Sequence, residues 1–237
     1  MRRRTRDTRC PNAGLTPRER GTHPRDASPA FRRARLALRR GESRVSARRV
    51  ARSGARTLRR VPRYAVLLRG INVGRAKRVA MADLRALLED AGYSTVRTHL
   101  NSGNVVLTGE DADPAEHAER IENAIRERLG IQVRCAVLTA DELRAVVEGH
   151  PFAAVADNGS RMMAYVYVRP VDPALVAGHP PVPQDPERAR VGDRAVYQWC
   201  PDGLMAAPDI GPYIKQHLRI DVTARNWNTI TKLGELI

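Results

Sequence analysis

The chain has 237 residues, a length that suggests one or two domains. It contains 41 Lys and Arg against 26 Asp and Glu, which gives a formal net charge of +15. No apolar run approaches the roughly 18 residues needed to cross a bilayer, which argues against an integral membrane protein. Cys10, Cys135 and Cys200 lie far apart without a CxxC motif or a Cys/His cluster. This spacing excludes a disulfide scaffold and a zinc finger, and it predicts a cytoplasmic protein.

The positive charge belongs to the first 63 residues. They hold 21 Lys and Arg against 4 Asp and Glu, a net of +17, and the other residues have a net of −2. A basic footprint indicates nucleic-acid binding only on a folded surface, so that function is disfavoured for the rest of the chain. Residues 1–62 contain one Phe and no Tyr, Trp or Ile. We therefore expect a disordered, Arg-rich tail.

Three origins of this tail can be compared. A secretory signal is disfavoured because no apolar run of about 7–15 residues is present, whereas an organelle transit peptide fits the Arg-rich, acid-poor bias. The third origin is a start codon assigned too far upstream, since the chain has 38 Arg and 3 Lys, as in a GC-rich gene. Under this hypothesis translation begins at Val61, and the intact mass of the natively expressed protein tests it.

Residues 63–139 carry the signals of a first α+β domain. Residues 64–68 form a continuous apolar run, typical of a central strand, and residues 81–91 have leucines at helical spacing. Two strands joined by a turn of Asn, Ser and Gly follow, and Asp113 with Pro114 then begins a second helix. With a last alternating strand at 133–137, the order is β-α-β-β-α-β, the pattern of the ferredoxin-like plait.

Residues 140–237 predict a second α+β domain with weaker signals. Thr139 and Glu142 have capping-box spacing before a helix, residues 163–168 form a strand, and a Pro-rich loop spans 170–190. Three later predictions complete the domain: a hairpin of residues 195–200 and 204–206, a helix capped by Asp209, and a last helix over residues 223–237.

Three motifs together resemble a known family. They are LLRGINVG at residues 67–74, NSGNVV at 101–106 and ARNWNTITKL at 224–233, with MADL at 81–84. From about residue 63 to the C-terminus the chain is similar to the bacterial DUF1697 family of unknown function. The resemblance implies two ferredoxin-like domains with antiparallel sheets, and it carries no catalytic residue. Many family members have a second Gly where this chain has Arg75. The family usually begins just before the strand at Tyr64, and this beginning supports a translation start at Val61.

Two loops are predicted to form a ligand site. In a plait, the connection over residues 71–80 and the turn over 101–104 lie at the same pole of the domain. The connection is long and cationic and leads into a helix N-terminus, which favours an anion. The alternative is that the glycines satisfy backbone angles, Asn104 is a turn residue, and the cations form a solvated loop.

The motif around Trp227 allows two interpretations as well. Trp227 fits a core anchor, and the polar residues beside it either close a contact between the two domains or bind a ligand. The complete set of predicted ligand-binding residues is Arg69, Asn72, Gly74, Arg75, Lys77, Asn101, Ser102, Asn104, Arg225, Asn226, Asn228 and Lys232.

Other chemistries lack support in the sequence. The six histidines show no metal spacing, Ser102 lacks a nucleophile-elbow setting, and no P-loop or GxGxxG occurs. We therefore expect no cofactor and no metal. Three functions stay open: a binding or regulatory protein for a phosphate-bearing small molecule or nucleotide, a phosphoryl-transfer enzyme that is acylphosphatase-like by fold analogy through Arg75 and Asn101, and an interaction module for another protein.

Overall fold

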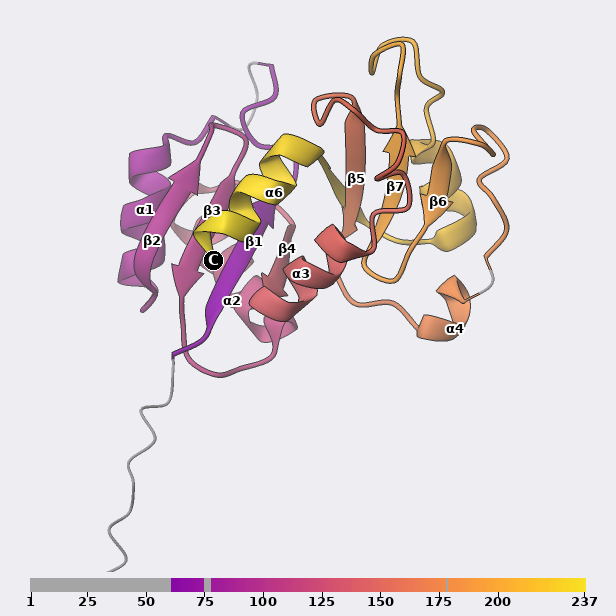
Figure 1. Ribbon diagram of the computed structural model, residues 1–237. Coiled ribbons are helices and arrows are strands. Elements are labelled where there is room, and N and C mark those ends of the chain that lie inside the picture. Colours follow the sequence, from indigo (N-terminus) through magenta and orange to yellow (C-terminus); the bar gives the residue numbers. More distant parts are fainter. Residues whose placement is uncertain (1–60, 75–77, 178) are drawn as a thin grey trace, which may run out of the picture. The chain divides into compact units, whose positions relative to one another are not determined.

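The computed structural model describes residues 61–74, 78–177 and 179–237 (Figure 1). Residues 1–60 of the predicted tail, Arg75 and Lys77 therefore lie outside the described residues. The described chain contains two four-stranded antiparallel sheets. No helix within these ranges is long and apolar enough to cross a membrane.

The first sheet has the strand order β2-β3-β1-β4. Its elements are β1 (Arg63–Leu68), α1 (Met81–Asp90), β2 (Ser94–His99), β3 (Asn104–Thr108), α2 (Pro114–Leu129) and β4 (Cys135–Thr139). Every neighbouring pair is antiparallel. The apolar strands β1 and β3 are central and β2 and β4 are at the edges, which confirms the ferredoxin-like order.

Local signals explain where the second helix begins and ends. The Asp113 carboxylate accepts a hydrogen bond from the Ala115 backbone N–H at 2.7 Å, and Pro114 occupies the first helical position. Gly130 ends α2 with φ of 67°, a left-handed conformation that glycine adopts without a steric penalty. The start predicted at Asp113 and Pro114 is therefore confirmed.

The second sheet repeats the same connectivity in the order β6-β7-β5-β8. Its elements are α3 (Ala140–Glu148), β5 (Met162–Tyr167), α4 (Pro173–Val176), β6 (Ala189–Val191), β7 (Ala195–Trp199), α5 (Gly211–Tyr213), the π-helical turn η1 (Ile214–Leu218), β8 (Val222–Asn226) and α6 (Trp227–Leu236). The first strand is central in both sheets and pairs with the third and the fourth. The fold is thus α+β with two ferredoxin-like sheets.

Two sequence predictions for this part were wrong. The partner of β7 in its hairpin is β6, across a turn in which Gly192 N–H donates to the Ala195 carbonyl, and residues 204–206 form no strand. Arg190 and Val191 of β6 pair with β7, and Met205 is fully exposed. The last helix begins four residues later than predicted, at Trp227, because the preceding residues pair with β5 as strand β8.

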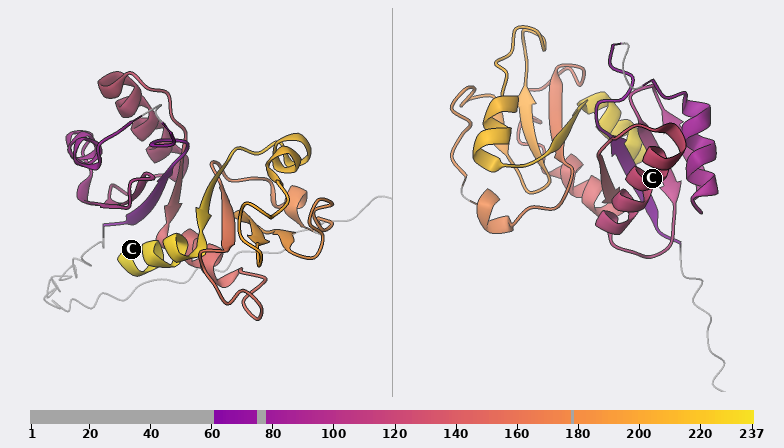
Figure 2. Two further views of the ribbon diagram at one scale, coloured as in Figure 1. Left: turned by 90° about the horizontal axis from the view of Figure 1, so that it is seen from above. Right: turned by 180° about the vertical axis from the view of Figure 1, so that it is seen from behind.

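Three apolar layers hold the sheets and helices together. Helices α1 and α2 cover one face of the first sheet, and α3 and α6 lie on its other face (Figures 1 and 2). Helix α6 contacts β3 of the first sheet and β5 of the second. Because one buried cluster contains Leu67 and Val106 of the first sheet with Ala164 and Ala195 of the second, the two sheets share this middle layer.

Candidate functional site

The two predicted loops meet at one end of the first sheet. The Leu68 N–H at the end of β1 donates to the Gly103 carbonyl in the β2–β3 turn at 2.8 Å. Beyond β1, Asn72 Nδ2 donates to the carbonyl of Asn101 at 2.6 Å. We call this end of the sheet the pole. The convergence that the plait topology predicts is therefore present.

Left-handed backbone conformations are concentrated at the pole. Asn72, Gly74, Leu100 and Gly103 have φ of 55°, 62°, 58° and 74°. A Cβ on Gly103 would lie 2.7 Å from the side chains of both Ile71 and Leu68, so close packing as well as φ requires glycine there. Leu100 carries a Cβ, which disfavours its left-handed φ, and the residue is 60% exposed.

The Asn72 side chain closes its own loop. Its Oδ1 accepts from the Val79 N–H at 2.8 Å, and its Nδ2 donates to the Val79 carbonyl at 2.9 Å as well as to Asn101. Both amide protons of Asn72 are thus engaged. Its role in this structure is to hold the β1–α1 connection against the β2–β3 turn.

A cavity of about 460 Å³ opens beside this loop and is called the pole pocket here. It is lined by Asn72, Gly74, Arg78, Val79, Ala80, Met81 and Asn101. Arg78 and Asn101 are exposed, and no hydrogen bond or ion pair joins either side chain to another residue in the described part of the chain. With respect to the described residues, both therefore have unpaired donors next to the cavity.

Helix α1 begins in the wall of the pole pocket. Ala80 is its N-cap, and no side chain of the described residues caps it. The first N–H groups of a helix lack intrahelical partners and carry the positive end of its dipole. The pocket thus combines uncapped backbone donors with the cation of Arg78.

Arg225 reaches the pole from the second sheet. It lies on β8, is 8% exposed, and uses all five of its N–H donors. Its Nη2 donates to the carbonyls of Leu68 at 2.7 Å and Ser102 at 2.8 Å, and its Nε donates to Asn104 Oδ1. Its Nη1 donates to Thr223 Oγ1 and to the Ala224 carbonyl, both at 2.8 Å.

No acceptor of the Arg225 guanidinium is a carboxylate. Burial of the cation among neutral groups lowers the pKa of Arg225 to about 10. Its partner Asn104 is fully buried, and Asn104 Nδ2 donates to the His99 carbonyl and to Ser102 Oγ, both at 3.0 Å. Neither Arg225 nor Asn104 has a donor left for a ligand, so both are structural groups of the pole.

The other residues of the predicted set lie elsewhere. Asn226 caps α6 by accepting from the Thr229 N–H at 3.0 Å, and Lys232 is paired with Glu235 at 2.8 Å. Asn228 is exposed and lies against Gly159. Arg69 forms an ion pair with Asp221 at 2.6 Å and does not line the pole pocket. The predicted set is thus split between the pole and other parts of the fold.

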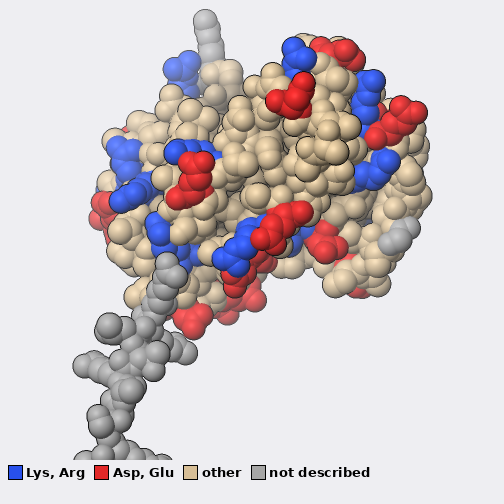
Figure 3. Space-filling model, viewed as in Figure 1, with Lys and Arg blue, Asp and Glu red and all other residues tan. Residues whose placement is uncertain are grey.

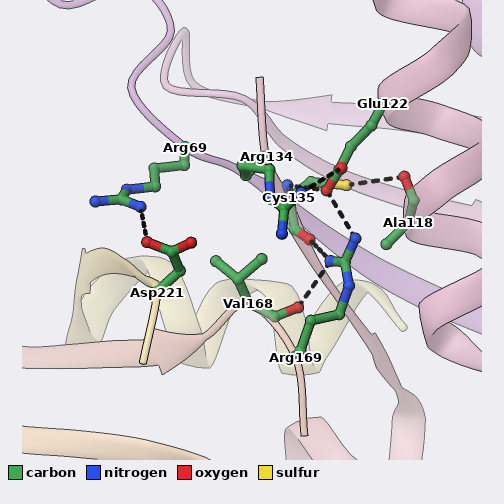
Figure 4. Close-up of polar contacts among 8 residues, drawn as sticks. All are labelled: Arg69, Ala118, Glu122, Arg134, Cys135, Val168, Arg169 and Asp221. Atoms are coloured by element: carbon green, nitrogen blue, oxygen red, sulfur yellow. Dashed lines mark hydrogen bonds and ion pairs between the residues drawn. The ribbon is translucent and has the colours of Figure 1, made fainter. Parts of the chain in front are cut away.

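A further polar link between the two sheets has no counterpart among the sequence predictions. Arg169 follows β5, and its Nη2 is 3.0 Å from the Glu122 carboxylate on α2 (Figure 4). Glu122 also accepts from the Cys135 N–H at 3.0 Å, and Arg169 Nη1 donates to the Cys135 carbonyl at 3.0 Å. These residues are far apart in sequence and share no motif, so no sequence signal could have found the link.

One face of the protein carries mixed charges (Figure 3), and His117 lies in the core. On the face drawn in Figure 3, acidic and basic side chains are interspersed. His117 is fully buried, with Nδ1 at 2.9 Å from Tyr93 Oη and Nε2 at 3.2 Å from the Glu110 carbonyl. Within residues 61–74, 78–177 and 179–237, no cluster of three or more His, Cys, Asp or Glu is placed to hold a metal ion.

Comparisons with known proteins give a family and a fold. A family model described as "Protein of unknown function (DUF1697)" matches residues 61–197. The solved structure of the conserved bacterial protein SP0830 from Streptococcus pneumoniae is similar at 26% identity with a TM-score of 0.56, covering 74% of this chain and 98% of that chain. No curated protein matches. Because the family model spans more than half of the chain, this protein belongs to the DUF1697 family.

Proposed function

We propose that the protein binds a small phosphate-bearing molecule or nucleotide in the pole pocket and acts as a binding or regulatory protein. One observation carries this proposal. A cavity of about 460 Å³ is lined by the uncapped start of α1, by Arg78 and by Asn101. Helix N-termini with nearby cations and amide donors favour phosphate groups.

The pocket favours binding over catalysis. Its described lining residues include Asn, Gly, Arg, Val, Ala and Met but no His, Cys, Ser, Asp or Glu. Nucleophilic and general acid–base catalysis need such side chains within hydrogen-bonding distance of the substrate. A cytoplasmic location is part of the proposal, since Cys135 and Cys200 are buried free thiols.

A thermal-shift screen of nucleotides and phosphorylated metabolites tests the proposal. A ligand present at 100 times its Kd raises the free energy of unfolding by about 2.7 kcal/mol. We expect Arg78→Ala and Asn101→Ala to weaken the binding of any ligand found by roughly tenfold each. Lys232→Ala is the control, because Lys232 is paired with Glu235 away from the pocket. A screen without a stabilising anion, or a ligand that binds both pole variants normally, contradicts the proposal.

An acylphosphatase-like enzyme is the alternative, favoured by the exposed amide of Asn101 at the pocket. By fold analogy, this amide would place a water molecule for attack on a bound acyl phosphate. Release of phosphate from acetyl phosphate tests the alternative directly. Turnover that is lost in Asn101→Ala supports an enzyme, and a background rate counts against it.

A further inference from the structure

We propose that Arg225 is a positioning residue for the pole pocket, acting on it from the second sheet. This inference rests on the proposed function. The Arg225 side chain does not line the pocket, and its five donors are all occupied. It acts by fixing the two chain segments that carry the pocket.

The hydrogen bonds from Arg225 span both segments. The Nη2 of Arg225 donates to the Leu68 carbonyl, where β1 ends and the connection to α1 begins. The same atom donates to the Ser102 carbonyl in the β2–β3 turn. Ser102 adjoins Asn101, whose carbonyl accepts from Asn72, and Asn72 in turn holds Val79. Hydrogen bonds, joined by the peptide link between Asn101 and Ser102, therefore connect β8 to the pocket wall.

The geometry of the guanidinium makes this role specific to arginine. Its planar fork presents five donors in fixed directions, whereas lysine offers three donors on one flexible ammonium. A lysine at this position keeps the positive charge but cannot hold Leu68, Ser102 and Asn104 together. Charge and positioning can thus be separated by the single substitution Arg225→Lys.

Arg169→Lys is the matched control. Arg169 also extends from the second sheet to the first, but it binds Cys135 and Glu122 on the β4 side and contacts neither pole loop. Both substitutions remove a bridging guanidinium and keep a positive charge. Any loss of pole-pocket affinity that depends only on weakened association of the sheets will therefore appear in both variants.

The experiment measures binding of AMP and of inorganic phosphate to the full chain by isothermal titration calorimetry. We expect the better of these two probes to bind Arg225→Lys roughly tenfold more weakly than wild type, and Arg169→Lys within about twofold of wild type. An unchanged Arg225→Lys, or equal losses in both variants, overturns the positioning role while the proposed function stands. A wild-type protein that binds neither probe removes the proposed function and this inference with it.

A second variant covers the case in which Arg225→Lys does not fold. Thr223→Val is nearly isosteric and removes only the hydroxyl, which accepts from Nη1 of Arg225 and itself donates to the Leu68 carbonyl at 3.4 Å. We expect it to weaken probe binding about threefold and to speed hydrogen exchange at the Leu68 amide, which donates to Gly103. Unchanged affinity and exchange in Thr223→Val would overturn the inference.

Discussion

The Arg225 guanidinium donates from Nη2 to the carbonyl oxygen of Ser102, 2.8 Å away and 123 positions earlier in the chain. The contact is partly buried and joins a strand of the second sheet to the turn of the first. A buried cation that lacks a carboxylate partner depends on neutral acceptors to offset its lost hydration. Arg225 thus contributes to the stability of the pole together with the Asn72 side chain.

Replacing Arg225 should lower the stability of the whole fold. Arg225→Met leaves the carbonyls of Leu68 and Ser102 and the amide oxygen of Asn104 without their donor, and we expect a loss of about 3 kcal/mol in the free energy of unfolding. Arg69→Met is the control, because its ion pair with Asp221 is exposed and should contribute less than about 1 kcal/mol. Urea denaturation of both variants gives these values. Equal losses in both variants would argue against a special role for Arg225.

Gly103 should tolerate no side chain. Gly103→Ala adds a Cβ 2.7 Å from Ile71 and Leu68 at a φ of 74°, and we expect a loss of about 2–4 kcal/mol. Gly203→Ala is the matched control, since its φ is 94° and its Cβ would have no neighbour within 4 Å. Only the backbone penalty of about 1–2 kcal/mol remains there. Chemical denaturation gives the free energy of unfolding of both variants, and the loss should be larger for Gly103→Ala.

His117 should make stability depend on pH. Burial lowers the pKa of His117 below its ordinary value of 6.5, although the Glu110 carbonyl and carboxylate oppose this and Arg120 adds to it. The unfolded chain therefore binds more protons than the folded one between the two pKa values, so stability is complete above about pH 6.5 and falls as the pH decreases below it.

The free energy of unfolding measured from about pH 7.5 down to about pH 5 checks this dependence. His150 contributes in the same direction, because burial also lowers its pKa. His117→Gln keeps a polar group in the cluster and should flatten the pH profile. A profile that stays equally steep in this variant would assign the dependence to other groups.

Cys135 should be unreactive in the folded protein. It is fully buried, its thiol donates to the Ala118 carbonyl at 3.7 Å, and burial raises the pKa of the thiol. Burial also raises the pKa of Cys200, to about 11. Since the thiolate is the reactive form, neither thiol should react with Ellman's reagent until the protein unfolds. The assay is made in a Cys10→Ser background, and fast labelling under native conditions would contradict the burial of these thiols.

The first sheet could be predicted because its signals are local. Continuous apolar strands, the leucine spacing of α1 and the Asp113–Pro114 cap each specify an element without reference to the rest of the chain. The same local chemistry led to the wrong partner for β7, because Pro-Asp-Gly at 201–203 is a strong turn signal. The real partner, β6, is only three residues long and begins within the last residues of the Pro-rich stretch.

The roles of the predicted site residues could not be assigned in the same way. Asn72 and Asn104 were correctly placed at the pole, but the partners that occupy their amides are set by tertiary contacts. Arg225 was predicted on a helix, and its position on β8 follows from pairing with β5, where its partner Ala164 lies 61 positions earlier in the sequence. Such long-range pairing leaves no periodic signal in a five-residue strand.

The most direct test of the pole pocket is a ¹⁵N–¹H correlation spectrum of the full chain titrated with inorganic phosphate and then with AMP. We expect saturable shifts of the amide signals at Gly74, at Met81 and Ala82 in the first turn of α1, and at Asn101, with no comparable shifts at Lys232 or Glu235 of α6. Shifts that are absent, or that occur away from these residues, would contradict an anion site at the pole.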